Sequence, residues 1–305
     1  MKIVVIGAGA MGSLFGGLLA EHKNDVTLLD IWQEHVNAIT SKGLSIERDG
    51  IQRQISVQAT TESESIGAAD LVIVFVKSTQ TAQAAQTAAK LISTTGMVLT
   101  LQNGMGNADI LAVGLGGDRV LAGTTSHGAT LLGPGMIRHA GIGATTIGLW
   151  QGADSTKTES VADLFNRAGI ETSVTVDVRS LIWGKLLINV GINAITALTG
   201  IKNGEITEFP AARHLAEMAV REAMTVAKAQ GISVRKDVVE HVLQVAQATA
   251  ANRSSMGQDV DNQRQTEIGA INGVVVEYAK KADIAVPVNE ALTCLVETLQ
   301  AHYSE

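Results

Sequence analysis

The segment Lys2-Ile-Val-Val-Ile-Gly-Ala-Gly-Ala-Met-Gly12 sets the architecture of the N-terminal half of this chain. A short apolar run enters three glycines spaced G-x-G-x-x-G, and a helical pattern then runs from Ala10 to His22. In this context the first glycine makes a tight turn, the second lets a pyrophosphate approach the backbone, and the third lets the helix pack on the strand. A bound phosphate is stabilised by the N–H groups of the helix N-terminus. The segment favours a dinucleotide site over a plain turn with packing glycines, and the candidate residues are Gly7, Ala8, Gly9, Ala10, Met11 and Gly12.

Strand and helix patterns alternate after this loop. Apolar runs at 26–30, 71–76 and 97–101 are typical of buried strands, and helical patterns separate them at 33–42 and 79–93. Such alternation predicts a parallel sheet with crossover helices, which is the Rossmann type of α/β domain.

Two further regions belong to the same predicted domain. The stretch 44–58 alternates around Asp49-Gly50, a dipeptide that favours a tight hairpin turn. Residues 119–149 contain short strand-forming runs separated by glycines, and they are expected to close the domain together with a helix at 155–168 and a strand at 172–176.

The strand pattern disappears near residue 178. Glycines and a proline separate the helical patterns that follow, which run over 178–199, 208–230, 235–252, 261–281 and 288–303. A chain of 305 residues is long for a single core, so two domains are expected. We place a dinucleotide-binding Rossmann domain at 1–177 and an all-helical substrate and catalytic domain at 178–305.

The composition narrows the classes of function. Thirty acidic residues against 23 basic ones give a net charge of −7 without any basic block, so no nucleic-acid partner is expected. The single cysteine, Cys294, cannot form an internal disulfide, and its place in the apolar pattern of the last helix predicts a core position. No uncharged run reaches the roughly 18 residues of a membrane span, and the N-terminus lacks signal-peptide features. We expect a cytoplasmic protein with no membrane partner.

Asp30 ends the second predicted strand, shortly after the glycine loop. An acid at this position can accept hydrogen bonds from the ribose hydroxyls of a dinucleotide and repels a 2′-phosphate. Capping of the next helix is its alternative role, and the two roles are compatible. Asp30 therefore favours NADH slightly over NADPH, a preference that Lys42 or Arg48 would oppose if either side chain folded over the site.

The segment 181–196 is apolar nearly all round and predicts a buried helix. Lys185, Asn189 and Asn193 interrupt it at i, i+4 and i+8, so they share one face. Burying an ammonium and two amides is costly without partners, which indicates either a lined cleft or an internal polar network. In a cleft, the lysine would stabilise the charge that hydride addition places on a ketone oxygen and donate a proton. The asparagines would orient a hydroxyl and a carboxylate.

Polar residues further along the chain are candidates with structural alternatives. Ser254 and Ser255, in a polar turn at 252–259, are placed to meet a substrate carboxylate or to cap helices. Glu267 precedes an apolar helical stretch, where it would serve either the site or the helix dipole.

In the first half, two polar positions follow strands. The loop Gln102–Gly106 and Lys77 lie where ligands bind in open α/β sheets, although ordinary turns occur there too. His127 and His139 do not have the spacing of a zinc site, and no metal is expected.

In their order and spacing these motifs resemble the ketopantoate reductase (2-dehydropantoate 2-reductase) family over nearly the whole chain. Each motif is only moderately specific, whereas the set is highly specific. The motifs are Gly7–Gly12, Lys77, Gln102-Asn-Gly-Met-Gly106, Gly123-Thr-Thr-Ser-His-Gly-Ala129, Trp183-Gly-Lys-Leu186, Asn189, Asn193, Asn203-Gly-Glu205, Ser254-Ser-Met-Gly-Gln-Asp259, Thr266-Glu-Ile268 and Ile271-Asn-Gly273.

The resemblance implies reduction of the small 2-keto acid 2-dehydropantoate to D-pantoate by a nicotinamide cofactor, NAD(P)H, in pantothenate biosynthesis. It implies that Lys185 is the catalytic acid and that Glu267 helps to hold the substrate hydroxyl and the cofactor. The implied substrate ligands are Asn103, Asn189, Asn193, Asn203 and Ser255. The implied cofactor ligands are the glycine loop, Lys77, Asn103 and Ala129.

One departure from the family concerns the cofactor. Many members place an arginine just after the second strand to hold the 2′-phosphate of NADPH, whereas this chain has Leu29-Asp30-Ile31-Trp32. The departure keeps open a related NAD-dependent D-2-hydroxy-acid dehydrogenase of the mandelate type. The segments 254–259 and 125–129 retain motifs of the ketopantoate reductase family, so ketopantoate stays the first-ranked substrate.

Two other functions rank lower. A dehydrogenase of the 3-hydroxyisobutyrate type has a glycine-rich substrate loop without a clear counterpart at 118–129. A non-catalytic dinucleotide sensor would not need Lys185, Asn189, Asn193 and Glu267 together. Helical second domains support monomers and dimers alike, so a homodimer stays open.

Overall fold

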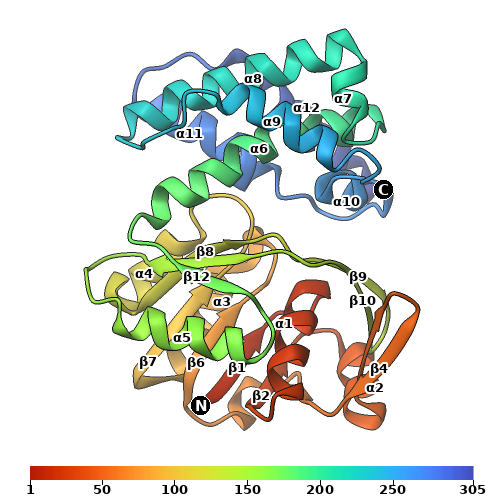
Figure 1. Ribbon diagram of the computed structural model, residues 1–305, viewed down its shortest axis with the longest axis vertical. Coiled ribbons are helices and arrows are strands. Elements are labelled where there is room, and N and C mark those ends of the chain that lie inside the picture. Colours follow the sequence, from red (N-terminus) through yellow and green to blue (C-terminus); the bar gives the residue numbers. More distant parts are fainter. Residues whose placement is uncertain (305) are drawn as a thin grey trace. The chain divides into compact units, whose positions relative to one another are not determined.

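The computed structural model describes residues 1–304, whose internal contacts divide the chain into two compact units (Figure 1). Unit 1 contains Met1–Gln102 and Asn107–Val178. Unit 2 contains the short loop Asn103–Gly106 and the chain from Arg179 onward.

Unit 1 is built on an eight-stranded sheet with the order β12-β11-β8-β7-β6-β1-β2-β5. Neighbouring strands are parallel except for β11 against β8. The chain starts in the middle at β1 and builds outward in both directions, which is the Rossmann arrangement and confirms the predicted α/β class. The strands are β1 (Lys2–Ile6), β2 (Asp25–Leu29), β5 (Gln58–Thr60), β6 (Ala69–Val74), β7 (Ile92–Thr100), β8 (Val120–Thr125), β11 (Thr145–Leu149) and β12 (Thr172–Val174).

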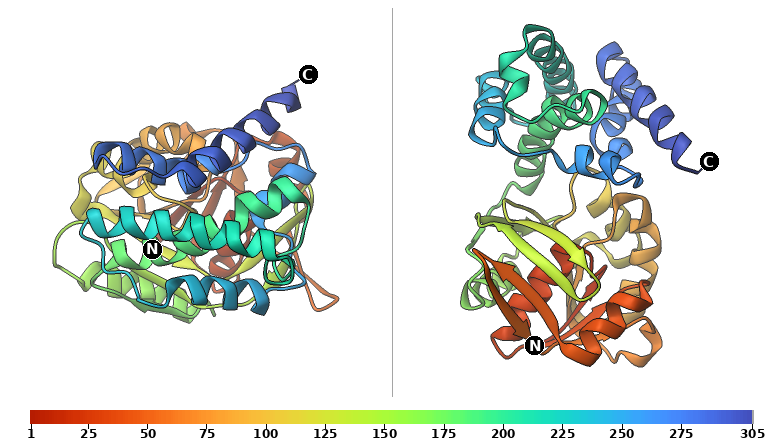
Figure 2. Two further views of the ribbon diagram at one scale, coloured as in Figure 1. Left: turned by 90° about the horizontal axis from the view of Figure 1, so that it is seen from above. Right: turned by 90° about the vertical axis from the view of Figure 1, so that its right-hand side faces the viewer.

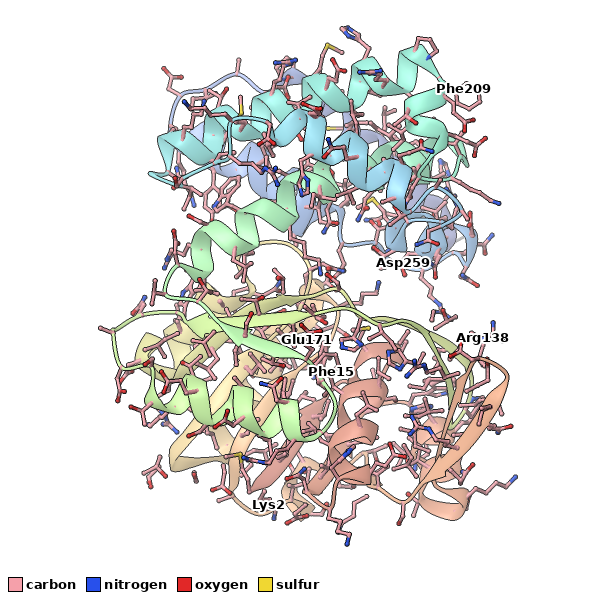
Figure 3. All side chains as sticks on the ribbon, in the orientation of Figure 1. Lys2, Phe15, Arg138, Glu171, Phe209 and Asp259 are labelled. Atoms are coloured by element: carbon pink, nitrogen blue, oxygen red, sulfur yellow. The ribbon has the colours of Figure 1, made fainter. Side chains whose placement is uncertain are left out.

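The helices of unit 1 connect these strands and bury their apolar faces. Phe15 of α1, labelled in Figure 3, is fully buried and packs against Phe75 and Phe165, with ring centroids 5.0 and 5.7 Å away. The predicted helices are confirmed within two residues, but α4 was not predicted. The helices are α1 (Ala10–Glu21), α2 (Gln33–Lys42), α3 (Thr81–Leu91), α4 (Asn107–Leu115) and α5 (Thr156–Arg167), with short 3₁₀ turns η1 (Ser63–Ser65), η2 (Ser78–Gln80) and η3 (Gly117–Arg119).

A second, four-stranded sheet covers α1. In this sheet the strands at 44–48 and 51–55 form a hairpin whose turn lies at Asp49 and Gly50. Both residues are in the left-handed region, with φ of 53° and 76°, as the dipeptide predicts. Gly17 permits the close contact with α1, because a Cβ there would lie 2.8 Å from a methyl carbon of Leu44. The order is β4 (Ile51–Ile55), β3 (Leu44–Arg48), β10 (Met136–Gly141) and β9 (Gly128–Gly133).

The glycine-punctuated region 119–149 therefore serves two sheets. β8 and β11 join the larger sheet, whereas β9 and β10 between them leave it and pair with β3. Periodicity alone did not reveal this split, because it identifies strands without identifying their partners.

Unit 2 is helical, as predicted, and Figure 2 shows α8 and α12 side by side. α6 packs closely on α8 and α9 at Gly191, where a Cβ would lie 2.7 Å from Val242 and 2.8 Å from Val220. The elements are α6 (Val178–Thr199), α7 (Glu205–Glu208), α8 (Pro210–Ala229), α9 (Val238–Ala248), α10 (Ser255–Asp261), the π-helix η4 (Gly269–Gly273), α11 (Val274–Lys281), α12 (Pro287–Ala301) and the 3₁₀ turn η5 (His302–Ser304).

α6 is long and apolar enough to cross a membrane by length and composition, with a mean hydropathy of 1.5. Within its 18-residue window, 61% is buried inside the protein. Trp183 is nearly fully buried and lies 6.0 Å from the ring of Tyr278. These features are typical of a core helix, which is how the sequence pattern was interpreted.

Three local predictions in unit 2 were wrong. The helix expected at 261–281 starts only at 268, because Gln263 has a φ of 51° and the backbone N–H of Arg264 turns back to the carbonyl of Asp259. The polar turn expected at 252–259 is instead occupied largely by α10. Cys294, predicted to lie in the core, is exposed on α12.

Candidate active site

The glycine loop has the backbone geometry that its sequence predicts. Gly7 has a φ of 91°, and a Cβ there would lie 2.8 Å from the backbone nitrogen of Val76. A Cβ on Gly12 would lie 1.9 Å from the carbonyl oxygen of Gly7, so only glycine fits. A Cβ on Gly9 would meet no atom within 4 Å. Thus Gly7 and Gly12 have no room for a side chain, whereas Gly9 leaves open space at the start of α1.

Asp30 is tied directly to this loop. One carboxylate oxygen accepts the backbone N–H of Ala8 at 2.6 Å, and the other accepts that of Trp32 at 2.9 Å. The N-cap residue of α2 is Trp32, so Asp30 joins the strand end to the loop rather than serving as the N-cap residue itself. Each oxygen retains a further lone pair for a ribose hydroxyl.

The other cofactor candidates of unit 1 lie at strand ends and in the smaller sheet. Lys77 is half-buried and precedes η2, just beyond β6. Gln102 follows β7, and its amide nitrogen donates to the carbonyl of Val76 at 2.7 Å and to the Thr81 hydroxyl at 2.9 Å. Ala129 lies in β9 and packs against the core of the unit. Since β1, β6 and β7 are parallel neighbours, the loop, Lys77 and Gln102 share one edge of the sheet.

Lys185 is the first of three polar residues on one face of α6. The helix is continuous from Val178 to Thr199, so Lys185, Asn189 and Asn193 follow one another at single-turn intervals. The Lys185 and Asn189 side chains are half-buried and Asn193 is buried. Burial lowers the pKa of Lys185 to about 8, and the Glu267 carboxylate opposes that change.

Glu267 is buried at the start of the segment that contains the π-helix. Its carboxylate accepts the Asn103 amide at 3.4 Å, and its charge acts on Lys185. The loop Asn103–Gly106 docks here because Gly104, with a φ of 83°, approaches Ala270 so closely that a Cβ would lie 2.3 Å from its carbonyl oxygen. The same oxygen accepts the N–H of Met105 at 3.0 Å.

This docking brings together residues that are far apart in sequence. Asn103 was a candidate from the first half of the chain, yet it belongs to unit 2 by its contacts. The role of Ala270 was missed by the sequence interpretation, since a backbone carbonyl carries no side-chain signal. The doubled glycine of Gln102–Gly106 was the available hint, because glycine often marks close backbone approach.

The two serines at the start of α10 have different surroundings. Ser254 accepts the N–H of Gly257 at 3.0 Å and the hydroxyl of Thr196 at 2.7 Å, so it caps the helix. Ser255 accepts the Asn193 amide at a long 3.4 Å. Both serines therefore contact α6, Ser255 at Asn193 and Ser254 at Thr196, but only Ser254 caps α10.

Asn203 lies in the loop that follows α6. Its amide nitrogen donates to the Thr249 hydroxyl at 3.0 Å, and its backbone N–H donates to the carbonyl of Asn252 at 3.0 Å. Within residues 1–304 its buried side-chain oxygen has no hydrogen-bond donor. A buried acceptor without a donor is costly, and a ligand hydroxyl would satisfy it.

His127 and His139 form a pair in unit 1. Their ring nitrogens lie 3.0 Å apart, and burial lowers the pKa of each imidazole. Across residues 1–304 no group of three or more His, Cys, Asp or Glu side chains is arranged to hold a metal ion. The absence of a resident metal stays a prediction.

Comparison with known proteins identifies relatives along both units. The family model described as "Ketopantoate reductase PanE/ApbA" matches residues 3–152, and that of "Ketopantoate reductase PanE/ApbA C terminal" matches residues 177–300. A 2-dehydropantoate 2-reductase of Halobacterium salinarum is 46% identical over 98% of this chain and 99% of its own length. That of Pyrococcus horikoshii is 39% identical over 99% of this chain and 98% of its own.

Solved structures show the same architecture. A PanE/ApbA family ketopantoate reductase from Ralstonia eutropha JMP134 matches with a TM-score of 0.93 and 31% identity over the whole of both chains. A D-mandelate dehydrogenase in complex with NADH and anilino(oxo)acetate also has a TM-score of 0.93, at 28% identity over 100% of this chain and 99% of that one.

The interaction of Lys185 with Glu267 predicts a shift on neutralising the acid. In Glu267→Gln the lysine loses the charge that raises its pKa, so its midpoint should fall below about 8. Titration of the Lys185 Cε signal by NMR in ¹³C-lysine-labelled protein measures this directly. Glu277→Gln is the matched control, because Glu277 pairs with Lys281 on the surface at 2.6 Å. A Lys185 midpoint that stays the same or rises in Glu267→Gln would contradict the assignment.

Proposed function

Because this chain belongs to the ketopantoate reductase family, we propose that it reduces 2-dehydropantoate to D-pantoate with a nicotinamide cofactor. The observation that carries the proposal is Lys185, a half-buried ammonium with its pKa lowered to about 8 beside a buried glutamate. A perturbed lysine of this kind is typical of an acid–base group.

When bound, the nicotinamide ring supplies the hydride that reduces the keto carbon of the substrate. Hydride addition leaves negative charge on the carbonyl oxygen, which the Lys185 ammonium stabilises before transferring its proton to form the hydroxyl group of pantoate. A pKa of about 8 keeps the amine mostly charged at neutral pH while making it a stronger acid than an exposed lysine. Glu267 opposes the effect of burial and so favours the charged amine.

The proposed substrate ligands belong, like this acid, to unit 2. Asn103, Asn189 and Asn193 offer amide groups without adding charge, which suits a hydroxyl and a carboxylate. The Asn203 side-chain oxygen offers an acceptor that a substrate hydroxyl would occupy. Ser255 contributes a hydroxyl next to Asn193.

The proposed cofactor ligands are the residues Gly7–Gly12, Asp30, Lys77, Asn103, Ala129 and Glu267. The open space at Gly9 supports the pyrophosphate position, and the charge of Asp30 supports NADH over NADPH because it would repel a 2′-phosphate. NADH is also the cofactor bound by the similar D-mandelate dehydrogenase.

We further propose that residues 1–177 are the dinucleotide-binding domain and 178–305 the catalytic domain. The enzyme would act in the cytoplasm on a small 2-keto acid, with no nucleic-acid or membrane partner, as a monomer or homodimer.

A second candidate is an NAD-dependent D-2-hydroxy-acid dehydrogenase of the mandelate type. The acidic residue Asp30 and the fold shared with D-mandelate dehydrogenase favour it. The higher identity to named 2-dehydropantoate 2-reductases, 46% against 28%, keeps ketopantoate first.

Steady-state kinetics with the two keto acids separates these candidates. We expect a larger kcat/KM for ketopantoate than for phenylglyoxylate with the same reduced cofactor. A clear advantage for phenylglyoxylate would reverse the ranking while leaving the oxidoreductase chemistry intact.

Removing the acid should abolish most of the turnover. In Lys185→Ala we expect a fall in kcat of about 10²-fold or more, the scale of lost acid catalysis, with unchanged affinity for NADH. Lys202→Ala is the control, because Lys202 is exposed just beyond the same helix. Stopped-flow and equilibrium titration measure the two quantities. Unchanged turnover in Lys185→Ala would refute Lys185 as the acid, whereas intact NADH binding without any turnover in the unaltered protein would favour a dinucleotide sensor.

The cofactor preference depends on the charge of Asp30. We expect a larger kcat/KM for NADH than for NADPH, and a smaller ratio between them in Asp30→Asn, which removes the charge but retains an acceptor for a backbone N–H. Asp25→Asn, at an exposed position of β2, serves as the control. A preference for NADPH in the unaltered protein would overturn this part of the proposal.

A further inference from the structure

A buried hydrogen-bonded chain connects the smaller sheet to the glycine loop inside unit 1. The N–H of Gly135, in the turn between β9 and β10, donates to Nδ1 of His35 at 3.0 Å. Nε2 of His35 lies 3.2 Å from the hydroxyl of Ser13 on α1. That hydroxyl donates to the carbonyl of Ala8 at 2.7 Å. His35 and Ser13 are both fully buried.

The direction of each hydrogen bond in this chain is fixed. Nδ1 of His35 accepts from a backbone N–H, so the proton of the neutral ring is on Nε2. The Ser13 hydroxyl donates its only hydrogen atom to the carbonyl of Ala8, so it must accept the N–H of His35 Nε2. Burial lowers the pKa of His35, against the opposing charge of Asp30, which favours the neutral ring that this arrangement requires.

The chain ends at Ala8, where the peptide groups on both sides of the Cα atom are held. The carbonyl of Ala8 accepts Ser13, and its N–H donates to Asp30. Ala8 lies between Gly7, which makes the tight turn, and Gly9, which has open space beside it. The Trp32 ring stacks on the His35 ring, with centroids 5.3 Å apart and an interplanar angle of 8°.

We propose that His35 and Ser13 are positioning residues for the dinucleotide, which hold the Ala8–Gly9 peptide group in the orientation that the pyrophosphate requires. They touch the loop and not the reacting atoms, so they act on cofactor affinity rather than on the chemical step. Neither residue lies within the G-x-G-x-x-G pattern, and neither is among the proposed cofactor ligands. The inference rests on the proposed function, since it takes the glycine loop as the cofactor site.

Two substitutions break the chain at different points. Ser13→Ala removes the central hydroxyl, and His35→Asn retains an acceptor near the Gly135 N–H but is too short to reach Ser13. Each should raise the Kd for NADH about tenfold, the effect of one lost buried hydrogen bond, while kcat at saturating NADH and the KM for the keto acid stay unchanged. The controls Ser41→Ala and His22→Asn, at exposed positions, should leave the Kd unchanged.

The double variant distinguishes a shared chain from two separate packing defects. If the chain acts as one unit, Ser13→Ala with His35→Asn should raise the Kd no more than either substitution alone. A Kd increase near the product of the two single effects would overturn the inference. So would an unchanged Kd in folded protein, or a loss of kcat at saturating NADH. Fluorescence titration with NADH, together with urea unfolding to establish the folded fraction, provides these values.

A further variant separates failure of this inference from failure of the proposed function. Gly9→Ala adds a methyl group into open space, so it should fold normally and still obstruct a pyrophosphate. Weaker NADH binding in Gly9→Ala with unchanged binding in Ser13→Ala would overturn the positioning role alone. Unchanged binding in Gly9→Ala would remove the glycine loop as the cofactor site, and the inference with it.

Discussion

The cost of taking the Lys185 ammonium out of water is the constraint around which unit 2 is arranged. Burial lowers the pKa of an amine on an apolar helix, and Glu267 opposes this through its negative charge. The glutamate is buried in turn, and Asn103 donates to it. The resulting group is charged at neutral pH, yet it gives up a proton more readily than a surface lysine would. Glu267 therefore offsets the cost of burying Lys185, and Asn103 offsets the cost of burying Glu267.

Unit 1 solves a different problem, which is to hold an irregular loop in one shape without filling it. Gly7 and Gly12 have no room for a side chain, whereas Gly9 has open space. The peptide groups before and after the neighbouring Ala8 are held by Asp30 and Ser13, respectively. Rigid surroundings around an open position are what a charged ligand requires, because an ordered backbone does not lose entropy when the ligand binds. The two units thus differ in chemistry, one offering backbone groups and the other titratable side chains.

Much of this arrangement could be predicted from sequence, and the failures share a cause. The elements β1, α2 and α6 follow from apolar periodicity, and the common face of Lys185 and Asn193 follows from helical spacing. Periodicity does not reveal partners, so the second sheet and the docking of Asn103 on unit 2 were missed. The π-helix that ends in Gly273 was also missed, since a single wider turn leaves the surrounding helical pattern almost unchanged.

The loop Asn103–Gly106 has a consequence for dissecting the chain. By sequence it connects β7 to α4 in unit 1, but its contacts belong to unit 2, where Gly104 meets Ala270 and the Met105 N–H finds its acceptor. A fragment truncated after the sheet-forming half would leave that N–H without its acceptor and the loop without its support. Conversely, a fragment starting at α6 would lack Asn103 and with it a donor to Glu267. The two halves of the chain are consequently not independent modules, because the segment Asn103–Gly106 from the first half makes its contacts with the second half.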